Sequence, residues 1–189
     1  MSTVSVVFDA CVLYPAPLRD FLLELASADL FRARWTDWIH DEWTKNLLEK
    51  RPDLLPGRIE RTRSLMNRAV PDCLVTGYEP LVPSIELPDE NDRHVVAAAV
   101  HAAADAIVTF NLKDFPPESL AKYNLEAIHP DDFIKLQLDF NGTAVFAAAR
   151  TCRQRLRNPP VSPERYIETL RMQSLPGTAA ALASGSSSI

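Results

Sequence analysis

Four acidic residues stand where strands and helices of this 189-residue chain are expected to begin, end or face solvent: Asp9, Glu42, Asp92 and Asp114. Carboxylates gathered in one pocket repel one another and take up protons unless a cation lies between them. Oxygen ligands without a His or Cys partner suit hard divalent cations such as Mg²⁺ or Mn²⁺. Such a cation can activate a bound water and clamp phosphodiester oxygens during in-line attack. The four acids therefore raise the hypothesis of a metal-dependent phosphodiesterase.

Taken singly, most of these acids have an ordinary structural explanation. Glu42 can be a solvated helix residue, Asp114 can be a turn residue, and the acids of the run 89–92 can cap a helix and favour its dipole. Asp9 is the exception, because it lies inside the apolar, β-branched run "VVFDACVLYP". A buried acid there costs free energy unless it has a partner. The hypothesis depends on the four together.

Alternating strand and helix patterns are expected to bring the acids together. Short apolar runs predict strands at 4–8, 31–36 and 106–111, with another just before residue 130. Helical patterns separate them, at 18–30, 37–50 with Asp37 as N-cap, 54–70, 89–105 and 130–138; strand and loop are expected over 72–81. This alternation predicts an α/β fold with a central parallel sheet. Ligands of such sheets bind beyond the carboxyl ends of the strands, and Asp9 lies at one of them.

The last fifty residues have a different character and predict a C-terminal helical appendage. A helix is expected over 142–158, before two prolines, and a second after Ser162 as N-cap with Pro163 at its first position. The small residues that follow predict a frayed tail. The predicted division is a domain at 1–138 and an extension at 139–189. Three arginines, Arg150, Arg153 and Arg157, would share one helical face and bind RNA or a partner, although a solvated face is the alternative.

Bulk composition narrows the class of protein without naming it. The net charge of −5 and the pI of about 5.4 argue weakly against a non-specific nucleic-acid coat, which is usually basic. The three cysteines are isolated and odd in number, which predicts neither a disulfide framework nor a zinc site. No secretory leader or membrane-spanning run is recognisable, so we expect a cytoplasmic protein.

Four motifs, in this order and spacing, resemble the PIN domain family: "VVFDACVLYP", "HDEW", "DENDRHVVAAAV" and "IVTFNLKDFP". The subgroup that the chain resembles is the VapC-type toxins of toxin–antitoxin pairs, over roughly residues 4–136. The resemblance implies a three-layer α/β/α domain, an endoribonuclease site dependent on Mg²⁺ or Mn²⁺, an RNA substrate and a cognate antitoxin. Relatives commonly form homodimers, but the oligomeric state of this chain stays open, as do its RNA target, its antitoxin and the number of metal ions.

The resemblance also assigns roles to single positions. The family's catalytic acids fall on Asp9, Glu42, Asp92 and Asp114, and its metal ligands on Asp9, Asp92 and Asp114. Thr109 matches a polar position that supports the site. Asn111 stands where many relatives carry a further acid, so the side of the site that would hold a second metal is expected to be weaker here.

Two other functions compete with the nuclease. The first is a nucleic-acid-binding or partner-binding module that keeps the fold without turnover. The second is a phosphatase with Asp9 as nucleophile, which we discount because Cys11 stands where such enzymes place a second acid. His94 is expected to be structural or to lie at the rim of the site. Of the tryptophans Trp35, Trp38 and Trp43, at least two are expected to pack in the core.

Overall fold

The computed structural model describes residues 3–189 and, within them, a sheet of four parallel strands in the order β2-β1-β3-β4. Val6 pairs with Ala33 on one side of β1 and with Ala106 on the other. Connections between parallel neighbours require crossovers, and helices supply them here. The strands are β1 (Ser5–Phe8), β2 (Arg32–Arg34), β3 (Ala106–Val108) and β4 (Glu126–Ile128). The predicted α/β fold with a central parallel sheet is confirmed.

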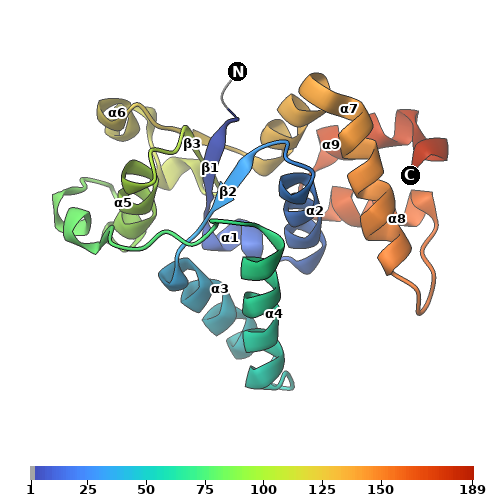
Figure 1. Cartoon of the computed structure of the whole chain (residues 1–189), viewed down its shortest axis with the longest axis horizontal. Helices are drawn as coiled ribbons and strands as arrows, with labels where there is room; N and C mark the ends of the chain where they lie inside the picture. The colour runs from blue at the N-terminus through green and yellow to red at the C-terminus, as the bar shows by residue number, and fades with distance from the viewer. Residues whose placement is uncertain (1–2) are drawn as a thin grey trace.

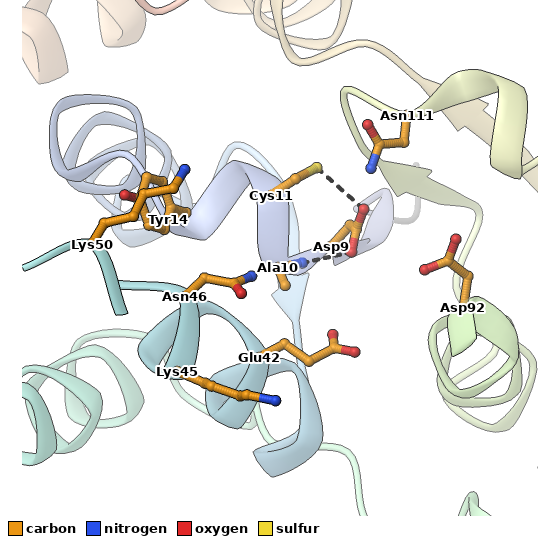
Figure 2. Close-up of a pocket in the computed structure, with 10 residues that line it drawn as sticks. All are labelled: Asp9, Ala10, Cys11, Tyr14, Glu42, Lys45, Asn46, Lys50, Asp92 and Asn111. Atoms are coloured by element: carbon orange, nitrogen blue, oxygen red, sulfur yellow. Dashed lines mark hydrogen bonds between the residues drawn. The ribbon is translucent and has the colours of Figure 1, made fainter. Parts of the chain in front are cut away.

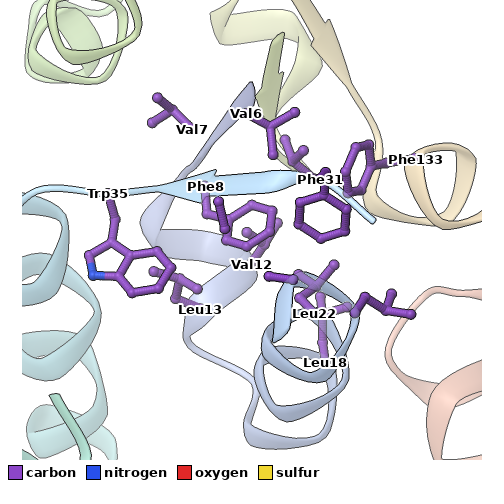
Figure 3. Packing of buried hydrophobic residues seen from close by; sticks show 14 of the residues in the cluster. Val6, Val7, Phe8, Val12, Leu13, Leu18, Leu22, Phe31, Trp35 and Phe133 are labelled. Atoms are coloured by element: carbon purple, nitrogen blue, oxygen red, sulfur yellow. The ribbon is translucent and has the colours of Figure 1, made fainter. Parts of the chain in front are cut away.

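Helices cover both faces of this sheet (Figure 1). Side chains of a strand alternate between faces, and Figure 3 shows Phe8 among aromatic neighbours while Val7 points away from them. The face of Phe8 is covered by α2 and the first half of α7; α5 packs on β1 and β3. The helices are α1 (Ala10–Leu13), α2 (Ala16–Ser27), α3 (Asp37–Lys50), α4 (Pro56–Ala69), α5 (Arg93–His101), α6 (Pro117–Leu120), α7 (Pro130–Arg155), α8 (Pro163–Met172) and α9 (Pro176–Ser184).

An aromatic group fixes α7 to the sheet. Phe133 of α7 lies edge-on to Phe31, with ring centroids 4.7 Å apart, and Phe31 lies edge-on to Phe8 at 5.9 Å. All three rings are buried. Edge-to-face aromatic pairs contribute roughly 0.5–1.5 kcal/mol each beyond the area they bury. The helix that leads into the C-terminal extension is therefore anchored in the core of the sheet domain.

Two local expectations were wrong. The N-cap of α3 is Thr36 rather than Asp37, because Thr36 has extended backbone angles and its hydroxyl accepts from the backbone N–H of Ile39 at 3.0 Å. Residues 72–81 form no regular strand; Leu74 makes one parallel bridge to Trp35, and the chain then turns through a 3-10 segment at Glu79–Ser84. Two prolines in that segment cannot donate to a sheet.

The C-terminal extension is packed to its end, so the predicted frayed tail was wrong. The run of small residues forms α9, in which Ala179 and Leu182 are fully buried, and Ile189 is 5% exposed. Alanines allow α9 to lie close against α7 and α8. The division at 138/139 stays a prediction; in the structure that point falls within α7, just before the kink at Asn141. The helices of residues 3–189 are not long and apolar enough to cross a membrane.

The three arginines of the extension do not share a helical face, which corrects that expectation. Arg157 lies beyond the end of α7, in an isolated bridge with Pro160. Arg150 and Arg153 donate to the backbone carbonyls of Ser188 and Val161. Both guanidinium groups therefore hold the extension together.

A buried carboxylate ties the extension to the sheet domain. Asp131, in the first turn of α7, is 7% exposed and accepts from the backbone N–H groups of Gly177 and Thr178, at 2.8 and 2.7 Å. These donors belong to the first turn of α9 and have no partner within that helix. A Cβ at Gly177 would lie 2.9 Å from the Asp131 carboxylate, so glycine permits the close approach.

We predict that Asp131→Ala destabilises the protein by about 1–3 kcal/mol, because two N–H groups lose their acceptor. The midpoint of thermal unfolding, followed by circular dichroism, should fall by several degrees. Asp132→Ala is the matched control, since Asp132 is exposed and its one ion pair within residues 3–189 is with Lys135. Equal midpoints for the two variants would contradict this role of Asp131.

Candidate active site

A cleft of about 620 Å³ opens beyond the carboxyl ends of β1 and β3. Three of the predicted acids, Asp9, Glu42 and Asp92, line it, and Figure 2 shows their carboxylates directed toward a common space. They come from the end of β1, the middle of α3 and the start of α5. The parallel topology thus assembles groups that are far apart in the sequence, as the sheet rule predicts.

Asp9 is the buried member of this group. It is the N-cap of α1 and 5% exposed, and its carboxylate accepts from the backbone N–H of Ala10 at 2.6 Å. The hydroxyl of Thr109 donates to it at 2.7 Å and the thiol of Cys11 at 3.2 Å. Burial nevertheless raises the pKa of Asp9, against the lowering effect of these hydrogen bonds, and the charge of Glu42 raises it further.

Thr109 joins the ends of β1 and β3. Its side chain is fully buried, its hydroxyl hydrogen serves Asp9, and its oxygen accepts from the backbone N–H of Asn111 at 3.0 Å. The backbone N–H of Phe110 donates to the sulfur of Cys11 at 3.3 Å. Because of this network, Asp9 presents a fixed carboxylate to the cleft. These hydrogen bonds fit the supporting role expected of Thr109, which stays a prediction.

Asp92 lies opposite Asp9, at the mouth of α5. Its pKa is raised to about 7, first by burial and then by the negative charges of Asp9, Asp89, Asp114 and Glu42. All four predicted acids are therefore close enough to interact electrostatically. Asp114 lies in the 3-10 turn Leu112–Asp114 and does not line the cleft, whereas Asn111 does.

The donor set fits a hard divalent cation. Over residues 3–189, no three His, Cys, Asp or Glu side chains are gathered closely enough to hold an ion among themselves. Mg²⁺ usually binds through one or two carboxylates and keeps several waters, so this separation does not exclude it. Burial and the charges of neighbouring carboxylates raise the pKa values of Asp9 and Asp92. A bound cation would offset this repulsion.

The basic side of the cleft was missed by the sequence reasoning. Lys45, Asn46 and Lys50 line it together with Tyr14, and the ammonium of Lys50 lies 5.1 Å from the centroid of the Tyr14 ring. A signal existed, because positions 42, 45, 46 and 50 fall on one face of a helix. One side of α3 thus contributes both lysines of the cleft and one of its three acids, Glu42.

The structure also shows where His94 and the three tryptophans lie. His94 is buried, and its Nε2 lies 3.1 Å from Oε1 of Glu42. Trp35 and Trp43 are buried in the core, whereas 45% of the surface of Trp38 is exposed. Core packing therefore accounts for two of the three tryptophans, as expected.

We predict that the ionisation of Asp92 destabilises the metal-free protein as the pH rises from about 4 to 7. The pKa of Asp92 rises from 3.8 to about 7 on folding, so in this window the unfolded chain releases a proton that the folded protein keeps. Asp92→Asn removes this destabilisation. It should stabilise metal-free protein by about 1–2 kcal/mol at pH 8, allowing for partial solvent screening, and have almost no effect at pH 4.

Urea unfolding in EDTA at the two pH values measures this difference. Asp139→Asn, which removes an exposed carboxylate outside the cleft, is the control and should change neither value. A loss of stability in Asp92→Asn at pH 8 would mean that the Asp92 charge is favourable in the folded protein.

Comparison with known proteins agrees with this geometry. The family model described as PIN domain matches residues 5–113, and the model described as VapC50 C-terminal domain matches residues 130–184. The protein named "Putative ribonuclease VapC50" of Mycobacterium tuberculosis (strain ATCC 25618 / H37Rv) is 36% identical over 120 residues, which cover 61% of this chain and 70% of that protein. No solved structure matches the chain. The chain belongs to the PIN domain family and is a VapC-type member with a C-terminal extension.

Proposed function

We propose that this protein is a metal-dependent endoribonuclease and the toxin of a toxin–antitoxin pair. The observation that carries the proposal is the buried carboxylate of Asp9, which faces Asp92 and Glu42 across one cleft at the carboxyl ends of parallel strands. The name of the Mycobacterium tuberculosis relative, a ribonuclease, supports the same class of reaction.

In this proposal, Asp9, Asp92 and Asp114 would hold Mg²⁺ or Mn²⁺ together with water molecules, because Asp114 lies outside the lining of the cleft and the three carboxylates are not close enough to bind an ion by themselves. The ion, when bound, would lower the pKa of a water molecule and offset the charge of the phosphodiester. The hydrogen bonds from Thr109 and Ala10 keep Asp9 oriented toward the cleft. Asn111 adds a neutral amide oxygen, which is a weaker ligand than the carboxylate that many relatives carry.

The remaining residues of the cleft act on the RNA and on the attacking water. Glu42 is exposed enough to reach solvent, with 32% of its side chain accessible, and it would accept a hydrogen bond from the attacking water. Lys45 and Lys50 place positive charge beside the acids, which suits phosphates of a single strand on either side of the bond that is cut. Binding of RNA therefore relies on local charge, although the net charge of the chain is negative.

A module that binds RNA or a protein without cutting is the second candidate. Two observations favour it: Asn111 lies in the cleft instead of an acid, and the acids of residues 3–189 are not close enough together to form a ligand set.

Under the leading proposal, the protein would act as a toxin on RNA in the cytoplasm and would require a cognate antitoxin to hold it inactive. Formation of a homodimer belongs to the same proposal.

We predict that protein purified free of antitoxin cuts single-stranded RNA only with Mg²⁺ or Mn²⁺ present and leaves a 5′-phosphate. Asp9→Ala should lower the rate by more than about 100-fold, since even the partners of metal ligands contribute about 10- to 100-fold. Asp114→Ala should be nearly as damaging and Asn111→Ala milder. Gel analysis of end-labelled RNA measures both the rate and the end group.

Cleavage in EDTA that survives Asp9→Ala would overturn the mechanism, and a 2′,3′-cyclic phosphate would indicate attack by the ribose hydroxyl. RNA that is bound but never cut with either metal would favour the binding module. Asp139→Ala serves as the control for loss of an acid outside the cleft.

A further inference from the structure

One side-chain contact joins the two helices that carry acids on opposite walls of the cleft. His94 lies in the first turn of α5, two residues after Asp92, and its Nε2 lies 3.1 Å from Oε1 of Glu42 on α3. The His94 side chain is fully buried, whereas 32% of the Glu42 side chain is exposed. Among residues 3–189, no Lys or Arg forms an ion pair with Glu42.

The surroundings of the ring define which nitrogen carries the proton. Nδ1 of His94 is buried and has no hydrogen-bond partner among the described residues. A proton on Nδ1 would be a buried donor without an acceptor, which costs about 1–3 kcal/mol. A proton on Nε2 instead points at a carboxylate oxygen. The ring therefore donates from Nε2 to Glu42.

A tryptophan fixes the plane of this ring. Trp38 stacks on His94 with ring centroids 4.4 Å apart and planes 2° from parallel. Trp38 lies one helical turn before Glu42 on α3, so α3 provides both the residue that orients the imidazole and the carboxylate that receives its hydrogen bond. Because the ring is stacked and buried, the direction of its N–H is set before substrate binds.

We propose that His94 is a positioning residue that holds the carboxylate of Glu42 in the cleft, facing Asp9 and Asp92. This inference rests on the proposed nuclease function, in which Glu42 orients the attacking water. A glutamate side chain has several rotatable bonds, and a partly exposed one samples many conformations. A fixed donor selects the conformation directed into the cleft, and a misplacement of about 1 Å at such a group can cost roughly 100-fold in rate.

Two substitutions separate the hydrogen bond from the packing of the ring. His94→Phe keeps an aromatic ring against Trp38 and removes the donor. His94→Gln places an amide N–H at a reach similar to that of Nε2. With Mg²⁺ and single-stranded RNA, His94→Phe should lower kcat by about 10- to 100-fold and change KM less than about 3-fold, because the interaction acts in the chemical step. His94→Gln should recover most of the lost rate.

A double-substitution cycle tests whether His94 acts through Glu42. In the Glu42→Ala background, His94→Phe should cause no further loss, since the group that it positions is absent. His40→Phe is the matched control, because His40 is a buried histidine that contacts Trp43 and Asn67 outside the cleft. It should lower the unfolding temperature and leave kcat per folded molecule unchanged.

Losses that add in the cycle, a His94→Phe enzyme with the wild-type rate, or a His94→Gln enzyme as slow as His94→Phe would each overturn the inference. A wild-type protein without RNA cleavage would refute the proposed function instead. In that case the crystal structures of the variants still decide the positioning role: the Glu42 carboxylate should leave its site in His94→Phe and keep it in His94→Gln. An unmoved Glu42 in His94→Phe would contradict that role.

Discussion

The rest of the site depends on keeping a carboxylate almost buried at the end of β1. A buried carboxylate must accept hydrogen bonds or take up a proton. The chain supplies hydrogen-bond donors from the turn that follows Asp9 and from the end of the neighbouring strand β3. The turn into α1 contributes the N–H of Ala10 and the thiol of Cys11, while the end of β3 contributes the hydroxyl of Thr109. The contact from Thr109 is only available because β1 and β3 are adjacent and parallel. The order of the strands and the environment of the Asp9 carboxylate therefore depend on each other.

Much of the architecture could be predicted because it follows local patterns. Short β-branched runs alternating with amphipathic ones leave few options other than a parallel sheet, and the acids at strand and helix ends then converge. The convergence of Asp9, Glu42 and Asp92 followed from this rule, and Asp114 lies near enough to act on the pKa of Asp92. The family resemblance assigned a role to each of these residues, which their spacing in the sequence could not do.

Predictions failed where a contact distant in the sequence decides the local structure. A run of alanines and serines gives no sign of burial, yet α9 is held by Asp131, more than forty residues earlier. The arginines of the extension looked like a surface patch because helical spacing cannot show that Arg150 meets the backbone of Ser188. Lys45 and Lys50 were overlooked for another reason: lysines on a helix are usually solvated, and only the packing of α3 against α1 turns them toward a cleft.

The course of α7 from the sheet domain into the extension has a consequence for how such a chain can change over generations. The helix begins in the aromatic core at Phe133 and ends where Arg155 meets Glu24, with a kink at Asn141 between them. Each residue added to a helix turns everything beyond it by about 100° and moves it by about 1.5 Å. A single codon inserted in α7 after the kink would therefore turn α8 away from α2, and it would also displace the loop that Arg153 holds through the carbonyl of Val161. Related chains should therefore keep the length of α7 between Asn141 and Arg155 even where its sequence changes.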